Sequence, residues 1–245
     1  LLENGSANVM KGAIVFSNTV TTVSPSYAWE ITQSRYSEGL GEVINKYRYK
    51  TIGILNGVDY SVYDPAQDKL ILANYNGRNP KQGKETNKTA LQLALNLPIN
   101  AEKAMIGVIS RLVDQKGLDV LAQAAEEILQ QDVQMVILGT GDSRYEEMMR
   151  ELARRHPDKV SANIYFDNTL AHKIYAACDF MLVPSVFEPC GLTQLIALKY
   201  GAVPVVRETG GLKDTVLSYN EQTQEGNGFS FAECNAHDLA FTVRR

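Results

Sequence analysis

One stretch decides the fold of this chain: residues 180–206, which have the sequence FMLVPSVFEPCGLTQLIALKYGAVPVV. Its first apolar run predicts a buried strand over 180–183, and apolar residues recur at helical spacing over 192–200. Gly201 ends that helix, and a second strand is expected at 203–206. In a strand–loop–helix–strand unit, the loop lies at the carboxyl edge of a parallel sheet. Open α/β sheets bind their ligands at this edge.

The same alternation of apolar strands and amphipathic helices fills the second half of the chain. Further strands are expected at 105–109, 133–138 and 162–166. Further helices are expected at 118–129, 145–152, 170–177 and 212–217. Strands and helices that alternate at this spacing predict an α/β protein whose parallel sheet is covered on both faces.

The first hundred residues have a weaker periodicity. Another helix begins at Pro25, with Ser24 as its N-cap. Asn56-Gly57 is a turn signal, and the polar passage 59–84 predicts a connection between two structural units. The remaining elements expected here are helices at 8–16, 38–47 and 87–97 and strands at 19–24 and 51–55.

Composition and charge exclude several classes of protein. The 245 residues carry a net charge of −4 and are 44% hydrophobic and 21% charged, as in ordinary globular proteins. Because no basic stripe is present, nucleic acid is not expected as a partner. No apolar run is long enough to span a membrane. Cys178, Cys190 and Cys234 are too scattered for a disulfide framework, which favours a reducing, cytoplasmic setting. The sequence shows no metal-binding set and no Ser/His/Asp triad.

The loop after 180–183 carries the first candidate for chemistry. Glu188 lies there, just before a helix whose first N–H groups favour an anion. Gly191 and Thr193 are small enough for a phosphate to approach the helix start. A carboxylate beside an anion site predicts a ligand that carries both hydroxyl groups and a phosphate. The alternative is that Glu188 is an ordinary solvated loop carboxylate.

A second loop, residues 110–117, follows strand 105–109 at the same sheet edge. Its Arg111 and Lys116 can hold a diphosphate, the arginine through a bidentate fork and the lysine as a point charge. Two solvated surface cations are the alternative interpretation.

Three weaker signals follow other strands. The glycine-containing turns 209–211 and 139–141 would let the backbone approach a nucleotide, but such turns are also common without a ligand. The aromatic ring of Phe166 could stack on a purine base, although an aromatic residue that ends a buried strand more often belongs to the core.

Taken together, these motifs resemble the family of bacterial glycogen synthases and plant starch synthases. The resemblance rests on residues 110–112, 115–117, 187–194 and 209–212, and it is supported by residues 22–28, 54–59 and 226–229. It covers most of the chain and is weakest between residues 60 and 100.

The resemblance implies the GT-B fold, in which two Rossmann-like domains face each other across a cleft. Residues 1–57 would be the last part of the acceptor-side, N-terminal domain. Residues 58–245 would be the nucleotide-sugar-binding, C-terminal domain, nearly complete but truncated at its end. Nothing matches the family's first strand with its lysine-containing, glycine-rich loop, or its cleft histidine. The chain alone is therefore expected to be inactive or very weak.

The resemblance also implies the reaction: retaining transfer of glucose from ADP-glucose to the non-reducing end of an α-1,4-glucan, glycogen or starch, with no cofactor and no metal. The catalytic candidates are Arg111, Lys116 and Glu188. Within the family's pattern, Asn56 matches a cleft asparagine, and Phe166 stands where an adenine-stacking tyrosine is usual. The full set expected to bind the nucleotide sugar is Asn56, Gly139, Gly141, Phe166, Cys190, Gly191, Leu192, Thr193, Thr209 and Gly210.

Two other functions stay open from the residues alone. A GT-B transferase that uses a UDP-sugar would need the same cations, and this chain could also be a non-catalytic nucleotide-binding module. If the chain belongs to a transferase, a front-side displacement is the simplest route to retention, because the sequence offers no clear carboxylate nucleophile. A bacterial enzyme is expected rather than a plastid one.

Overall fold

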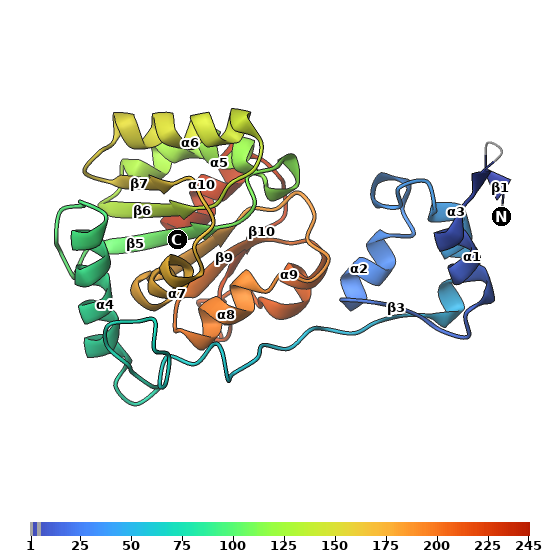
Figure 1. Ribbon diagram of the computed structural model, residues 1–245, viewed down its shortest axis with the longest axis horizontal. Coiled ribbons are helices and arrows are strands. Elements are labelled where there is room, and N and C mark those ends of the chain that lie inside the picture. Colours follow the sequence, from blue (N-terminus) through green and yellow to red (C-terminus); the bar gives the residue numbers. More distant parts are fainter. Residues whose placement is uncertain (1, 4–5) are drawn as a thin grey trace.

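A computed structural model describes residues 2–3 and 6–245 of the chain. Its largest feature is a six-stranded sheet in the order β10-β9-β8-β5-β6-β7, in which every neighbouring pair is parallel (Figure 1). The strands are β5 (Ala104–Ile109), β6 (Val133–Leu138), β7 (Val160–Asn163), β8 (Phe180–Val183), β9 (Val203–Arg207) and β10 (Phe229–Phe231).

Helices cover both faces of this sheet, as the apolar strands require. All six residues of β6 are buried, which is typical of a strand covered on both sides. Residues of β5 alternate between the two faces, so that Ile106 and Val108 join one core and Met105 joins the other. One face packs against α5 (Leu118–Leu129), α6 (Ser143–Arg155) and α10 (Ala236–Arg244), and the other against α4 (Pro80–Ala94), α7 (Asn168–Ala177) and α8 (Thr193–Lys199).

Residues before the sheet form a smaller group with its own core of Ile14, Val43 and Ile44. A two-stranded parallel sheet pairs β3 with β4, and an antiparallel pair joins β1 to β2. The elements are β1 (Leu2–Glu3), β2 (Ser6–Ala7), α1 (Val9–Phe16), β3 (Val20–Thr22), α2 (Pro25–Glu30), α3 (Gly41–Lys46) and β4 (Thr51–Gly53). Residues 54–79, which contain no helix or strand, connect this group to α4 (Figure 1).

Most of the expected elements are confirmed, and the differences have physical reasons. The helix expected at 87–97 is α4, which begins seven residues earlier because Asn79-Pro80 starts it with proline in its first turn. It ends before Asn96, whose positive φ of 56° leaves the helical region. The strand expected at 162–166 is β7, which ends at Asn163, so Phe166 lies in a loop.

The end of the chain holds elements that were not expected. Short β10 adds to the edge of the sheet beside β9, and α10 packs against α5. Helix α9 (Gly210–Thr215) begins at the glycine pair, two residues before the expected start, and α8 begins at Thr193.

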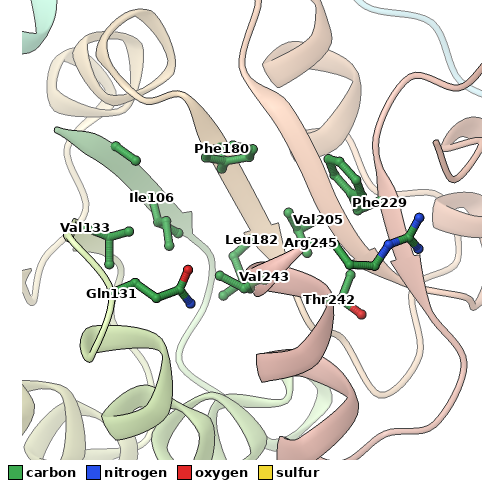
Figure 2. A pocket seen from close by; sticks show the side chains of 11 residues that line it. Ile106, Gln131, Val133, Phe180, Leu182, Val205, Phe229, Thr242, Val243 and Arg245 are labelled. Atoms are coloured by element: carbon green, nitrogen blue, oxygen red, sulfur yellow. The ribbon is translucent and has the colours of Figure 1, made fainter. Parts of the chain in front are cut away.

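An apolar cavity of about 240 Å³ lies between the sheet and α10 (Figure 2). Its lining includes Ala104, Val133 and Phe180, which are the first residues of their strands. Figure 2 shows Leu182 and Val243 on its walls. It therefore lies at the amino edge of the sheet, away from the loops expected to bind a ligand.

Candidate functional site

Two adjoining cavities open at the carboxyl edge of the sheet. The first, here the aromatic cavity, has a volume of about 260 Å³ and is lined by Tyr63, Tyr165, Phe166 and Tyr175 together with the ends of β5 and β6. The second, the charged cavity, has a volume of about 150 Å³, and its walls include Lys116, Ser185, Glu188 and residues 191–193. Ile109, Ser110 and Arg111 line both. A ligand that fills both cavities therefore passes Arg111.

An ion pair lies in the charged cavity. Lys116 Nζ lies 2.5 Å from Glu188 Oε2, and the side chains are 17% and 10% exposed. Ser185 Oγ donates to the same carboxylate oxygen over 3.0 Å. Because both charges are largely withdrawn from water, each depends on the other for compensation. Glu188 is therefore not the solvated carboxylate of the alternative interpretation.

Close backbone contact between two loops brings this pair together. Gly117 has a φ of 65°, and a Cβ atom there would lie 2.1 Å from the carbonyl oxygen of Pro184. The Val186 N–H donates to the carbonyl of Gln115 over 2.8 Å. The Gln115 side chain donates to the carbonyl of Phe187 over 3.2 Å. The loop after β5 is thus joined to the loop after β8 on both sides of Lys116.

Arg111 is exposed and donates to Gln115 Oε1 over 3.2 Å. Within residues 2–3 and 6–245, no carboxylate forms an ion pair with it. A guanidinium at the junction of two cavities that has no anion of its own can bind a phosphate group from a ligand. In the neighbouring wall, no described side chain caps the N-terminus of α8.

The aromatic cavity contains Phe166 together with residues that the sequence patterns did not single out. Phe166 is 86% exposed, so its alternative interpretation as a core residue is wrong. Tyr175 is buried on α7, and burial raises the pKa of its phenol far above the usual value, while a hydrogen bond with Thr193 acts in the opposite direction. Tyr175 thereby joins the aromatic cavity to the charged one.

Tyr63 reaches this cavity from the connecting segment 54–79. Its ring stacks on His172, with a centroid distance of 4.9 Å and an interplanar angle of 16°. His172 Nδ1 lies 2.7 Å from Asp68 Oδ2, and the Tyr200 hydroxyl donates to the same oxygen over 2.6 Å. This buried cluster holds the connecting segment against α7 and α8. No periodic pattern marks Tyr63 in the sequence.

Several expected ligand-binding residues lie outside both cavities. Cys190 is buried, and its Sγ contacts the carbonyl of Gly191. Gly141 allows close contact between loops, because a Cβ atom there would lie 2.3 Å from the carbonyl oxygen of Leu112. The residues that line neither cavity are Asn56, Gly141, Cys190, Thr209 and Gly210, whereas Gly139, Phe166, Gly191, Leu192 and Thr193 line one of them.

The donors of Thr209 and Gly210 are already engaged. The Gly210 N–H donates to Glu30 Oε1 over 2.8 Å, and the Thr209 hydroxyl donates to the same carboxylate. In this arrangement Glu30 engages both donors, and the binding of the nucleotide sugar by Thr209 and Gly210 stays a prediction.

The described residues contain no group of three or more His, Cys, Asp or Glu side chains that could hold a metal ion. In the same part of the chain, no helix is both long and apolar enough to cross a membrane.

Comparison with known proteins gives two family matches. Residues 94–245 match the family described as glycosyl transferases group 1, and residues 1–46 match the starch synthase catalytic domain. The chain is 52% identical over 240 residues to the glycogen synthase of Clostridium novyi (strain NT), covering 98% of this chain and 50% of that relative. It is 48% identical over 241 residues to the glycogen synthase of Alkaliphilus metalliredigens (strain QYMF), with the same coverage. The chain thus spans about half the length of the curated relatives it matches.

Solved structures agree with these matches. The catalytic domain of starch synthase IV from Arabidopsis thaliana, bound to ADP and acarbose, superposes with a TM-score of 0.91 at 39% identity. It covers 98% of this chain, which covers 50% of that structure. A sucrose-phosphate synthase from Thermosynechococcus elongatus, with a TM-score of 0.64 at 20% identity over 97% of this chain and 51% of its own, shares the fold. The α/β architecture of the GT-B type and the resemblance to glycogen and starch synthases are therefore confirmed, and the chain belongs to the glycosyl transferases group 1 family.

Proposed function

We propose that the full-length gene product containing this chain is a retaining glucosyltransferase. It moves glucose from ADP-glucose to the non-reducing end of an α-1,4-glucan. One observation carries the proposal: the Lys116–Glu188 pair lies in a charged cavity that joins an aromatic cavity at Arg111. The glycogen synthase relatives and the ADP-bound starch synthase support this choice of substrates.

The two cavities would hold different parts of ADP-glucose. The adenine ring would lie in the aromatic cavity, where Phe166 offers an exposed face for stacking. The diphosphate would lie at the junction, between the guanidinium of Arg111 and the ammonium of Lys116. The glucose would lie toward Glu188, whose carboxylate accepts hydrogen bonds from sugar hydroxyl groups. Lys116 would then contact both the phosphate and Glu188.

The reaction breaks the bond between C1 of glucose and the phosphate oxygen, and negative charge grows on the departing ADP. The positive groups of Arg111 and Lys116 stabilise that negative charge. Electrostatic stabilisation of this kind is usually the largest catalytic contribution. Glu188 keeps the sugar ring oriented. In a front-side displacement, the acceptor hydroxyl bonds to C1 on the face that ADP leaves, and its proton passes to the departing phosphate oxygen. A covalent glucosyl–protein adduct would overturn this step.

Asp167 also lies at the aromatic cavity, but its carboxylate already caps α7. Its Oδ1 accepts the Leu170 N–H over 2.8 Å. This bond supports a structural role for Asp167 rather than a nucleophilic one.

The test is turnover of ADP-glucose with glycogen by the full-length gene product, with UDP-glucose as the competing donor. We expect transfer from ADP-glucose and little or none from UDP-glucose. Faster transfer from UDP-glucose would favour the alternative GT-B enzyme. Saturable binding of ADP without any turnover in the full-length product would favour a non-catalytic nucleotide-binding module. The 245-residue chain alone should show ADP binding with little or no transfer.

The expected partners are ADP-glucose and an α-1,4-glucan, without a cofactor or a metal. The three free cysteines suit the reducing cytoplasm of a bacterium.

A further inference from the structure

A buried carboxylate joins two distant parts of the chain. Glu30 is the last residue of α2 and is 8% exposed. Its Oε1 accepts the backbone N–H of Gly210, 180 residues later, over 2.8 Å. The Thr209 hydroxyl donates to the two carboxylate oxygens over 3.1 and 3.2 Å. In the described part of the chain, no basic side chain forms an ion pair with Glu30, so these donors compensate its charge.

The turn that Glu30 holds, residues 209–211, is packed against the backbone that carries Glu188. The Gly211 N–H donates to the carbonyl of Glu188 over 3.0 Å. A Cβ atom on Gly210 would lie 2.0 Å from that carbonyl oxygen, and one on Gly211 would lie 2.1 Å from the carbonyl oxygen of Cys190. With no space between these backbones, a shift of the turn must shift the Glu188 loop.

The other end of α2 is fixed just as closely. A Cβ atom on Gly53 would lie 2.2 Å from the carbonyl oxygen of Ser24, the N-cap of α2. Gly53 ends β4, and Asn56, the expected cleft asparagine, follows three residues later. Helix α2 therefore connects the segment that carries Asn56 to the turn that contacts Glu188.

A second contact attaches α2 to α9. The Ser26 N–H and hydroxyl donate to the two oxygens of Asp214 over 2.8 and 2.5 Å. This pair lies in the same interface as Glu30, but its hydrogen bonds do not involve residues 209–211. It therefore provides a matched control for the effect of simply weakening the interface.

We propose that Glu30 is a positioning residue for Glu188: by holding the 209–211 turn, it sets the Glu188 carboxylate in register with the α2–β4 unit. The role of Glu188 in glucosyl transfer rests on the proposed function. The mechanical link from Glu30 to the Glu188 loop does not depend on it. In this arrangement Glu30 acts through backbone contacts and does not touch the substrate.

Hydrogen exchange in the 245-residue chain tests the link without any need for catalysis. The informative amides are those of Gly211, which donates to Glu188, and Val186, which lies in the Glu188 loop and donates to Gln115. Glu30→Ala should speed exchange at both amides by at least about tenfold. Glu30→Gln, which keeps an acceptor for the Gly210 N–H, should stay close to wild type. Ser26→Ala should leave the exchange rate of the Val186 amide within about twofold of the wild-type rate. Amides of β6 report global unfolding and should not change.

Kinetics of the full-length gene product test the consequence. Glu30→Ala should lower kcat by about 10- to 100-fold, while KM for ADP-glucose changes less than about threefold, because Arg111, Lys116 and the aromatic cavity are untouched. Glu30→Gln should recover most of kcat, and Ser26→Ala should have normal kcat. Each kcat is calculated per ADP-binding site, and the concentration of sites is measured by titration with ADP. A smaller fraction of folded enzyme then does not appear as a lower kcat.

If Glu30→Ala speeds exchange at Gly211 but leaves Val186 unchanged, Glu30 is an interface contact and the inference is wrong. Equal losses of kcat in Glu30→Ala and Ser26→Ala would also overturn it. If the wild-type product transfers no glucose from ADP-glucose, the proposed function fails, and the exchange result still decides whether Glu30 controls the Glu188 loop.

Discussion

Lys116 and Glu188 are 72 residues apart in the chain, yet their charged groups lie 2.5 Å apart. Since both are mostly buried, removing one leaves the other without compensation. Lys116→Met should therefore lower the free energy of unfolding by about 1–3 kcal/mol and lower kcat by about 10²–10³-fold. The double variant Lys116→Met/Glu188→Gln should regain much of the stability but none of the activity. Urea unfolding and steady-state kinetics measure both effects. A double variant as unstable as Lys116→Met would contradict this account of the pair.

Arg111 should matter for turnover far more than for folding. Its guanidinium is exposed and its described side-chain partner is Gln115, so Arg111→Ala should move the unfolding midpoint by less than about 2 °C. Because the same group opposes charge on the departing diphosphate, kcat/KM for ADP-glucose should fall by about 10²-fold or more. Arg150→Ala, on the exposed side of α6, is the control and should have normal kinetics. An unchanged rate in Arg111→Ala would remove this residue from the site.

Phe166 offers a direct test of where the base binds. The ring is 86% exposed, so Phe166→Ala should leave stability unchanged. Stacking on a base is worth about 1–3 kcal/mol, which predicts roughly 5- to 150-fold weaker ADP binding. Phe241→Ala serves as the control, because Phe241 is 52% exposed on α10, away from both cavities. Isothermal titration of the 245-residue chain measures both, and equal affinities would place the base elsewhere.

Burial of Cys178 makes the stability that its thiol contributes depend on pH in the alkaline range. Burial raises the pKa of its thiol from 9.0 to about 12. Between these values the unfolded chain has released the proton and the folded chain has not. The contribution of this thiol to the free energy of unfolding therefore falls as the pH rises above about 9, by about 1.4 kcal/mol per pH unit. Neighbouring Lys84, whose pKa burial lowers to about 8, contributes a slope of opposite sign over part of this range, so the effect of the thiol is measured as a difference between wild type and a variant that keeps Lys84.

Cys178→Ala isolates the effect of the thiol. In urea unfolding at pH 7.5, 9.0 and 10.5, the free energy of unfolding of Cys178→Ala should rise relative to that of wild type between the last two values, whatever the cost of the substitution at pH 7.5. Cys234→Ala, a change at a half-buried position, should have the same pH dependence as wild type. The same pH dependence of unfolding in wild type and Cys178→Ala would show that the thiol does not titrate as described.

The sequence predicted the sheet well because its strands carry strong local signals. The strand at 133–138 is apolar at every position except Gln134, and the helix at 118–129 has a clear apolar face. The boundaries of both elements agree with the structure. Helix α4 was misplaced because its buried face includes Gly83, Asn87, Lys88 and Gln92, which a search for apolar periodicity overlooks. These polar groups are buried because they bind carbonyl and side-chain groups of distant segments, as Lys88 does with Asp179. Such partners exist only in the folded chain.

The site was predictable to the extent that it follows strand ends. Arg111, Lys116 and Glu188 lie in loops after β5 and β8, and neighbouring parallel strands bring such loops together. Tyr63 could not be assigned in this way, because the irregular connecting segment gives no pattern from which to place it. The engagement of Thr209 and Gly210 by Glu30 was equally hidden, since it depends on how α2 docks on α9.

The glycine at position 117 sets a strict limit on variation in this protein. Its α-carbon lies so close to the loop after β8 that an added methyl group would overlap the backbone there. The Cβ atom of that group would lie 2.1 Å from the carbonyl oxygen of Pro184. Even alanine, the most conservative replacement, would wedge the two strand-end loops apart and draw the lysine ammonium out of reach of its carboxylate. The ion pair between Lys116 and Glu188 thus depends on residue 117 having only a hydrogen atom as its side chain.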